Sequence, residues 1–247
     1  LADYAALVFG ATLVLRQLGY LEGRFLRREL TALSAYRALF HVNAHLFLRT
    51  LGLLFAIAFF TAQGARQGDT ILAANAVLLQ FIMLTSYALD GFAHAAESLV
   101  GRAYGRRDWQ AFATIVKAAA RFSLWTTIVA SLAFALGGNA LIALLTGLPE
   151  VRATAAVYLP WMVVMPLIAV WSYLFDGVFI GTTAVTEMRN SIFIALAVYL
   201  PTWWLATELL APPLHNHALW CSFTLFTLVR SSVLILYYRR YRLTRWR

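Results

Sequence analysis

The feature that most constrains this chain is a set of long apolar stretches without charge. From Thr70 to Ala88, nineteen consecutive residues carry no charged side chain. Because an α-helix rises about 1.5 Å per residue, about twenty such residues cross the roughly 30 Å hydrocarbon layer of a bilayer. A soluble helix of this length would still present charges to water. The composition, 62% hydrophobic and 13% charged, also lies far from that of soluble proteins. The sequence therefore predicts a membrane protein.

Hydropathy predicts about seven transmembrane helices and an all-α, polytopic membrane helix bundle. The expected spans are 2–20, 44–63, 71–89, 122–145, 157–180, 192–209 and 219–238. The first span begins at the second residue, the chain has no initiator methionine, and no signal-peptide cleavage site follows the span. We therefore expect the chain to be a fragment that starts within a helix.

Basic residues mark one side of the predicted membrane. Thirteen arginines fall in alternate connections and at the C-terminus, against two on the other side, Arg66 and Arg152. The thirteen are Arg24, Arg27, Arg28, Arg37, Arg102, Arg106, Arg107, Arg189, Arg239, Arg240, Arg242, Arg245 and Arg247. Positive loops face the cytoplasm, so the C-terminus is predicted to be cytoplasmic. The net charge of +9 is then explained by membrane lipids as partners, and nucleic acid is excluded.

A few ionisable residues lie within or close to the apolar spans. Asp90, His94 and Glu97 share one helix face at spacings of four and three. Asp90 lies nineteen residues beyond Ile71, about 28 Å along a helix, which places it at the cytoplasmic edge of the hydrocarbon. Asp176 repeats the pattern. Two further residues, Arg49 and Arg230, have similar depth, so the sequence predicts a layer in which both arginines meet Asp90, Asp176 and Glu97.

The role of this layer stays open between two interpretations. It is either a static ionic latch that fixes helix packing or a protonatable gate in a transport cycle. A metal site with His41 and His45 lacks the spacings of known hydrolase or di-iron motifs, and Cys221 is the single cysteine, so no metal and no cofactor is predicted. The sequence has no nucleophile elbow, nucleotide loop or dinucleotide fingerprint, so no enzyme activity is predicted.

Uncharged polar residues inside the spans are candidates to line a substrate cavity. They are Asn43, Asn75 and Gln80 on the second and third spans and Tyr173 on the fifth. Most such residues bond to a neighbouring helix or to their own backbone, and the sequence does not say which faces line a cavity.

Two stretches carry a resemblance to a known family. The stretches "YALDGFAHAAESLVGRAYGRRD", Tyr87 to Asp108, and "YLFDGVFIGTTAVTEMRNS", Tyr173 to Ser191, resemble the eighth and tenth helices of the multidrug and toxic compound extrusion (MATE) family, in its DinF-like branch. The resemblance implies two six-helix lobes. Residues 1–21 then correspond to the last helix of the N-terminal lobe, 22–38 to a cytoplasmic linker between the lobes, and 39–247 to the C-terminal six-helix lobe.

The resemblance also implies a function. We expect part of a secondary active efflux transporter in a bacterial-type plasma membrane, which exchanges small cationic or amphipathic substrates for a cation by alternating access. Its partner would be the N-terminal lobe of the same protein. The residues from Arg37 to Gly68 include no acid where sodium-coupled relatives have one, so protons are expected ahead of sodium. A lipid-linked precursor flippase of the same superfamily and a non-transporting membrane scaffold remain as alternatives.

Overall fold

The computed structural model describes residues 2–18 and 33–244, and the described residues form helices joined by short turns. The α-helices are α1 (Ala2–Leu18), α3 (Leu33–Ala65), α4 (Asp69–Gly105), α5 (Trp109–Leu145), α6 (Pro149–Gly181), α7 (Val185–Leu209) and α8 (His215–Thr244). A 3-10 turn, η1 (Pro212–Leu214), precedes α8. The predicted all-α membrane bundle is confirmed.

Six of the described helices, α3 to α8, are long and apolar enough to cross a membrane. They match the second to seventh predicted spans. The first predicted span corresponds to α1, which has 17 residues within the described range, and its expected end at residues 19–20 lies outside that range. Most of the predicted inter-lobe linker at 22–38 also lies outside the described residues.

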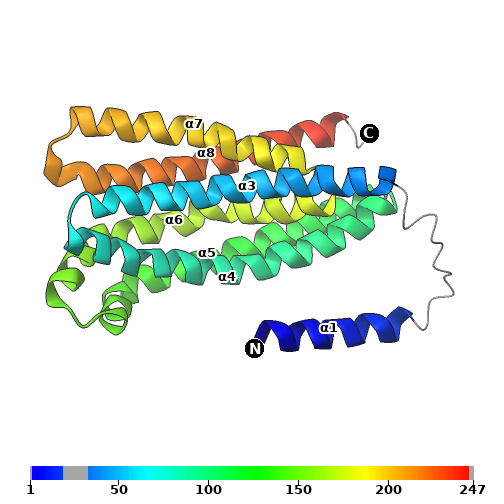
Figure 1. Ribbon diagram of the computed structural model, residues 1–247, viewed down its shortest axis with the longest axis horizontal. Helices are drawn as coiled ribbons and strands as arrows, with labels where there is room; N and C mark the ends of the chain where they lie inside the picture. Colours follow the sequence, from blue (N-terminus) through cyan, green and yellow to red (C-terminus); the bar gives the residue numbers. More distant parts are fainter. Residues whose placement is uncertain (1, 19–32, 245–247) are drawn as a thin grey trace. The chain divides into compact units, whose positions relative to one another are not determined.

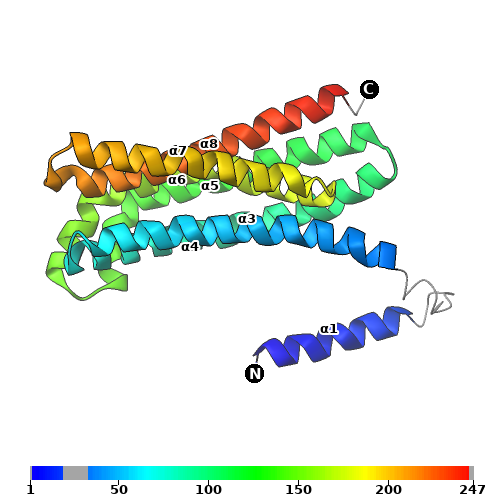
Figure 2. The ribbon, with the colours of Figure 1, turned by 45° about the horizontal axis from the view of Figure 1, so that its top comes forward.

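The chain divides into two compact units, Leu1–His41 and Val42–Arg247. The first holds α1 and the start of α3. In the second, the helices run lengthwise beside one another, with α7 along α8 (Figures 1 and 2). Helix α6 contacts α4, α5, α7 and α8 and is therefore the central helix of this unit.

Helices α4 and α5 extend well beyond the predicted spans. Each has 37 residues, and at about 1.5 Å per residue each is about 55 Å long, nearly twice the thickness of the hydrocarbon layer. The α4 span was predicted to end at Leu89, but the helix continues through Asp90, His94 and Glu97 to Gly105. Hydropathy detects only the apolar part of a helix, whereas a charged extension also forms a stable helix in water.

Small residues let α4 and α6 touch at the backbone. A Cβ atom added to Gly177 would overlap the backbone of Ala93, and one added to Gly181 would lie 2.5 Å from the carbonyl oxygen of Glu97 and 3.1 Å from the backbone nitrogen of Gly101. Gly177 and Gly181 form a GxxxG pair, the spacing that allows close helix packing in membranes. This contact holds the segment of α6 that carries Asp176 close to α4.

Two turns end helices with a left-handed residue that is not glycine. After α4, Arg107 has φ 57°, and after α6, Thr183 has φ 58°. The hydrogen-bond pattern is the same in both: Asp108 N–H donates to Ala103 O (3.0 Å) and Ala184 N–H donates to Phe179 O (2.8 Å). These are Schellman ends, which usually place glycine at this position.

The buried apolar residues form two clusters. One includes Phe60, Phe81, Met162 and Trp220, and the other includes Phe112, Phe179, Met188 and Leu234. On α8 the first cluster ends at Phe226 and the second begins at Leu234, and Arg230 and Ser231 lie between them. On α3, Arg49 lies in the corresponding gap. Buried polar residues therefore form a layer between two apolar cores.

Candidate functional site

The centre of this layer is a cluster of three charges from three helices. Arg49 on α3 and Arg230 on α8 each donate a hydrogen bond from Nη2 to Oδ2 of Asp176 on α6. Asp176 and Arg230 are each 7% exposed, and the Arg49 side chain is 19% exposed. The predicted meeting of both arginines with Asp176 is found. The packing of α6 against α8 brings Asp176 next to Arg230, and the long Arg49 side chain reaches the same carboxylate from α3.

The cluster holds two cations and one anion. Both arginines use the same carboxylate oxygen, while the other oxygen, Oδ1, and the Nε atoms of Arg49 and Arg230 are buried without a hydrogen-bond partner among the described residues. An isolated buried charge is costly, so a shared carboxylate stabilises both guanidinium groups without neutralising them. The cluster keeps a net charge of +1 and unused hydrogen-bonding groups.

The other acids predicted in this layer lie outside the cluster. Asp90 is partly buried and makes no ion pair with any residue of the described ranges, although it is close enough to Arg49 and Asp176 to interact with them electrostatically. The distance from Glu97 Oε2 to His94 Nδ1 is 3.5 Å, and the two side chains are 36% and 78% exposed. The expected contacts of the arginines with Asp90 and Glu97 were wrong, because α4 turns both acids toward the surface.

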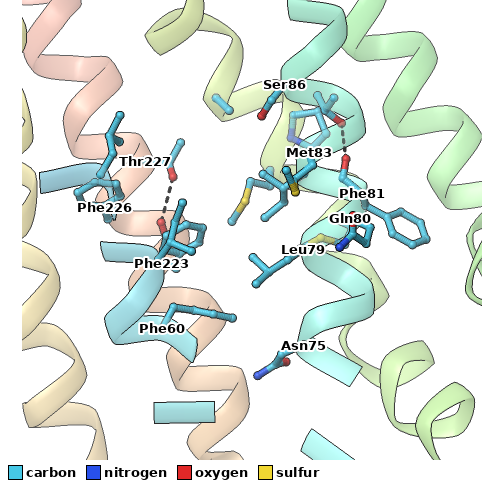
Figure 3. Close-up of a pocket in the computed structure, with 18 of the residues that line it drawn as sticks. Phe60, Asn75, Leu79, Gln80, Phe81, Met83, Ser86, Phe223, Phe226 and Thr227 are labelled. Atoms are coloured by element: carbon cyan, nitrogen blue, oxygen red, sulfur yellow. Dashed lines mark hydrogen bonds between the residues drawn. The ribbon is translucent and has the colours of Figure 1, made fainter. Parts of the chain in front are cut away.

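A cavity of about 530 Å³ adjoins the cluster. Figure 3 shows Leu79, Met83 and Ser86 of α4 on one side and Phe223, Phe226 and Thr227 of α8 on the other. Helices α3, α5 and α6 complete the lining, with Phe60, Phe134, Met162, Met165 and Pro166 among their residues. Arg230 also lines the cavity, so the ion cluster begins where the apolar wall ends. Apolar and aromatic walls with a few polar groups are typical of sites for small organic molecules.

Most polar groups of the lining are already used by the fold. The hydroxyls of Thr61, Thr85 and Thr227 donate to backbone carbonyls one turn earlier on their own helices, at 3.0, 2.9 and 3.1 Å. Ser172 contacts Ser231 of α8 through their hydroxyl oxygens, which lie 2.6 Å apart. The threonines therefore bond within their own helices, and only the serine pair joins two helices, α6 and α8.

The four predicted cavity residues have different environments. Asn75, Gln80 and Tyr173 line the cavity, and Asn43 is exposed on α3 and does not. Tyr173 shares a hydrogen bond with Ser86 of α4. Gln80 is exposed, and its side chain makes no hydrogen bond with any residue that the structure describes, so its amide is available to a ligand.

Asn75 is held in an amide pair that the sequence did not predict. Its Nδ2 donates to Asn216 Oδ1 (2.7 Å), and Asn216 Nδ2 donates back to Asn75 Oδ1 (3.0 Å). Trp220 Nε1 donates to the same Asn75 oxygen at 2.9 Å. Asn216 was placed in a loop because the last span was predicted to begin at residue 219, whereas α8 begins at His215. Its position one turn before a buried tryptophan was the available signal.

The possible metal ligands of the described residues do not come together in a metal site. In the described ranges, no group of three His, Cys, Asp or Glu side chains is arranged to hold a metal ion. The site consists of an ion cluster next to a mostly apolar cavity.

Fold and site together define a polytopic α-helical membrane protein whose bundle encloses an apolar cavity ending at buried charges. The MatE family model matches residues 51–205, which include the cavity walls on α4, α5 and α6 and also Asp176. The chain belongs to the MatE family, the MATE proteins.

Two curated proteins show the same relationship. The chain is 40% identical over 243 residues to DNA damage-inducible protein F of Escherichia coli K12, which covers 98% of this chain and 51% of that protein. It is 23% identical over 188 residues to Protein DETOXIFICATION 42 of Arabidopsis thaliana, covering 76% of this chain and 36% of that protein. The chain thus spans about half the length of the first relative and about a third of the second.

Solved structures of the family share the fold. The MATE transporter VcmN of Vibrio cholerae, in a bent form, superimposes with a TM-score of 0.79 at 18% identity, over 94% of this chain and 51% of that one. A MATE protein in a bent conformation gives a TM-score of 0.71 at 17% identity, over 78% and 42% of the two chains. The predicted family is confirmed.

Proposed function

We propose that this chain forms the C-terminal lobe of a secondary active efflux transporter that exports small amphipathic compounds in exchange for protons by alternating access. The observation that carries this proposal is the cavity of about 530 Å³ inside a MATE lobe, with apolar walls and a buried ion cluster at one end. The predicted cationic substrates stay a prediction, since no acid lines the cavity within the described ranges.

Asp176 is the candidate for coupling. Its carboxylate joins α3, α6 and α8 through two arginines, so a proton on it would weaken the ion pairs that hold these helices together. A sodium ion would need several oxygen ligands, whereas the groups bonded to this carboxylate are guanidinium N–H donors, which offer none. Proton exchange therefore fits the cluster better than sodium exchange.

The proposal includes a second lobe and a location. The chain matches about half of the Escherichia coli relative, and the family fold is built from two lobes, so we propose that an N-terminal lobe completes the cavity. The bacterial relative favours a bacterial inner membrane. The cytoplasmic position of the C-terminus remains the prediction made from the arginine distribution.

The test is substrate-driven proton flux in liposomes that contain the protein at its native length. We expect Asp176→Asn to abolish flux and Asp90→Asn and Glu97→Gln to reduce it less, because only Asp176 joins three helices. Glu208→Gln, on an exposed residue at the end of α7, is the control for loss of an acid. Normal flux in all three variants would mean that the ion cluster is a static latch. Absence of flux in the unmodified protein would favour the alternative of a non-transporting membrane scaffold.

A further inference from the structure

The charge of the cavity points to a class of substrate. Arg230 is the one charged residue that lines the cavity, and among the described residues no acid or lysine joins it. A cavity that selected cations would be expected to place a carboxylate on its wall. In this lobe the wall carries the positive charge of Arg230 instead, at the end of an apolar surface.

Arg230 is buried and incompletely bonded. Its side chain is 9% exposed, its Nη2 donates to Asp176, and its Nε is buried without a hydrogen-bond partner among the described residues. A guanidinium group has five N–H donors in a fixed plane and binds carboxylate or phosphate with two parallel bonds. The bond to Asp176 uses only part of this capacity.

The surrounding charges leave Arg230 attractive to an anion. Asp176 is shared with Arg49, so one negative charge is divided between two positive ones. Asp90 is close enough to act electrostatically on this cluster, but it is half-exposed and does not line the cavity. Solvent screens its charge, whereas the buried cluster is screened much less.

We propose that the cavity of this lobe binds amphipathic acids, with the apolar body against the aromatic wall and the anionic group at Arg230. The wall is formed by Phe60, Phe81, Phe134, Phe223 and Phe226. On α8, Phe226 and Phe223 lie four and seven residues before Arg230, and Figure 3 shows the labelled phenylalanines of α3 and α8 together. This inference rests on the proposed function, because it names the substrate that the transporter would carry.

The charge of Arg230 can be removed by substitution without leaving another buried charge unpaired. In Arg230→Gln, the pair of Arg49 with Asp176 remains and is neutral. In Arg49→Gln, the pair of Arg230 with Asp176 remains, and the cavity keeps its arginine. The two variants have the same total charge, so they separate the effect of net charge from the effect of a guanidinium group on the wall.

The experiment uses three probes with one apolar body: 1-pyrenebutyrate, 1-pyrenebutanol and 1-pyrenebutylammonium. The protein at its native length is placed in nanodiscs of zwitterionic phosphatidylcholine, and saturable energy transfer from its tryptophans to pyrene reports binding. We expect the carboxylate to bind about tenfold tighter than the alcohol, the gain typical of a hydrogen bond to a charged group, and the ammonium to bind weakest.

Substitutions of single arginines test whether the carboxylate group of the probe binds at Arg230. Arg230→Gln should bring the carboxylate and the alcohol within about twofold of each other, and Arg49→Gln should keep a preference for the carboxylate. Arg121→Gln, on an exposed residue of α5, is the control for charge and should keep the full tenfold preference. Arg230→Lys retains the charge and replaces Arg230→Gln in this comparison if Arg230→Gln does not fold.

Two outcomes would overturn the proposal: equal or reversed affinity for the carboxylate and the alcohol in the unmodified protein, or a full preference retained in folded Arg230→Gln. The measurement needs no ion gradient. Carboxylate preference without proton-coupled export would contradict the proposed function alone, and export without carboxylate preference would contradict this inference alone.

Discussion

Arg230 on α8 donates to the same oxygen of Asp176 on α6 that also accepts from Arg49 on α3, so one carboxylate joins three helices. The arrangement is asymmetric. Removal of either arginine leaves a neutral pair, whereas removal of the carboxylate leaves two buried cations without a counter-ion.

We expect Asp176→Asn to destabilise the protein by about 3–5 kcal/mol, the usual cost of an uncompensated buried charge, and Arg230→Gln to cost clearly less. Thermal unfolding in detergent, followed by tryptophan fluorescence, measures both. Glu208→Gln controls for the loss of an exposed acid. Equal losses of stability in the two cluster variants would contradict the shared-carboxylate account.

A second prediction concerns the contact of α4 with α6. Gly177→Ala should destabilise the protein by about 1–3 kcal/mol, because the new methyl group would overlap the backbone of Ala93 and push the helices apart. The same measurement applies. Gly91→Ala is the matched control, since a methyl group there has no neighbour within 4 Å, and it should be neutral or stabilising by up to about 1 kcal/mol.

A third prediction concerns the amide pair. Asn75→Ala should cost about 1–3 kcal/mol, because it leaves buried donors of Asn216 and Trp220 without their acceptor. Substitution of Asn216 by alanine as well should add less than its separate cost, since the pair acts as one unit. A double-mutant cycle of unfolding free energies tests this coupling. Strict additivity would show that the two amides act independently.

Any effect of Asn75→Ala on export should then follow its effect on stability, because the amide is engaged with α8 rather than offered to the cavity. Gln80→Ala is the informative comparison. The Gln80 amide lines the cavity and makes no hydrogen bond with the described residues, so its loss should change substrate affinity while the unfolding temperature stays the same.

A fourth prediction concerns the turn after α4. Arg107→Gly should stabilise the protein by about 0.5–1 kcal/mol, because φ at this residue is 57° and glycine adopts that conformation without strain. The neighbouring Arg106 has φ −84°, so Arg106→Gly removes the same charge and should instead destabilise slightly. A lower unfolding temperature for Arg107→Gly than for Arg106→Gly would contradict this explanation.

Several parts of the site could be predicted from the sequence, because each depends on local composition. The uncharged run before Asp90 indicated a span, and the similar depth of Arg49, Arg230 and Asp176 indicated a charged layer. The prediction that Asp90 and Glu97 also contact the two arginines was wrong. Depth follows from counting residues along a helix, but the direction in which a side chain points depends on how that helix is rotated against its neighbours.

The sequence by itself determined that this is an all-α membrane protein of the MATE family, because hydrophobic length and family motifs are properties of continuous segments. Only the tertiary structure decided that α6 is central and that Asp176 takes both arginines while Asp90 and Glu97 do not. It also decided that Asn75 is bonded to Asn216 and that Arg230 lines the cavity. The physical reason is that a buried charge or amide must find a partner, and the partner is chosen by the packing of helices that lie far apart in the chain.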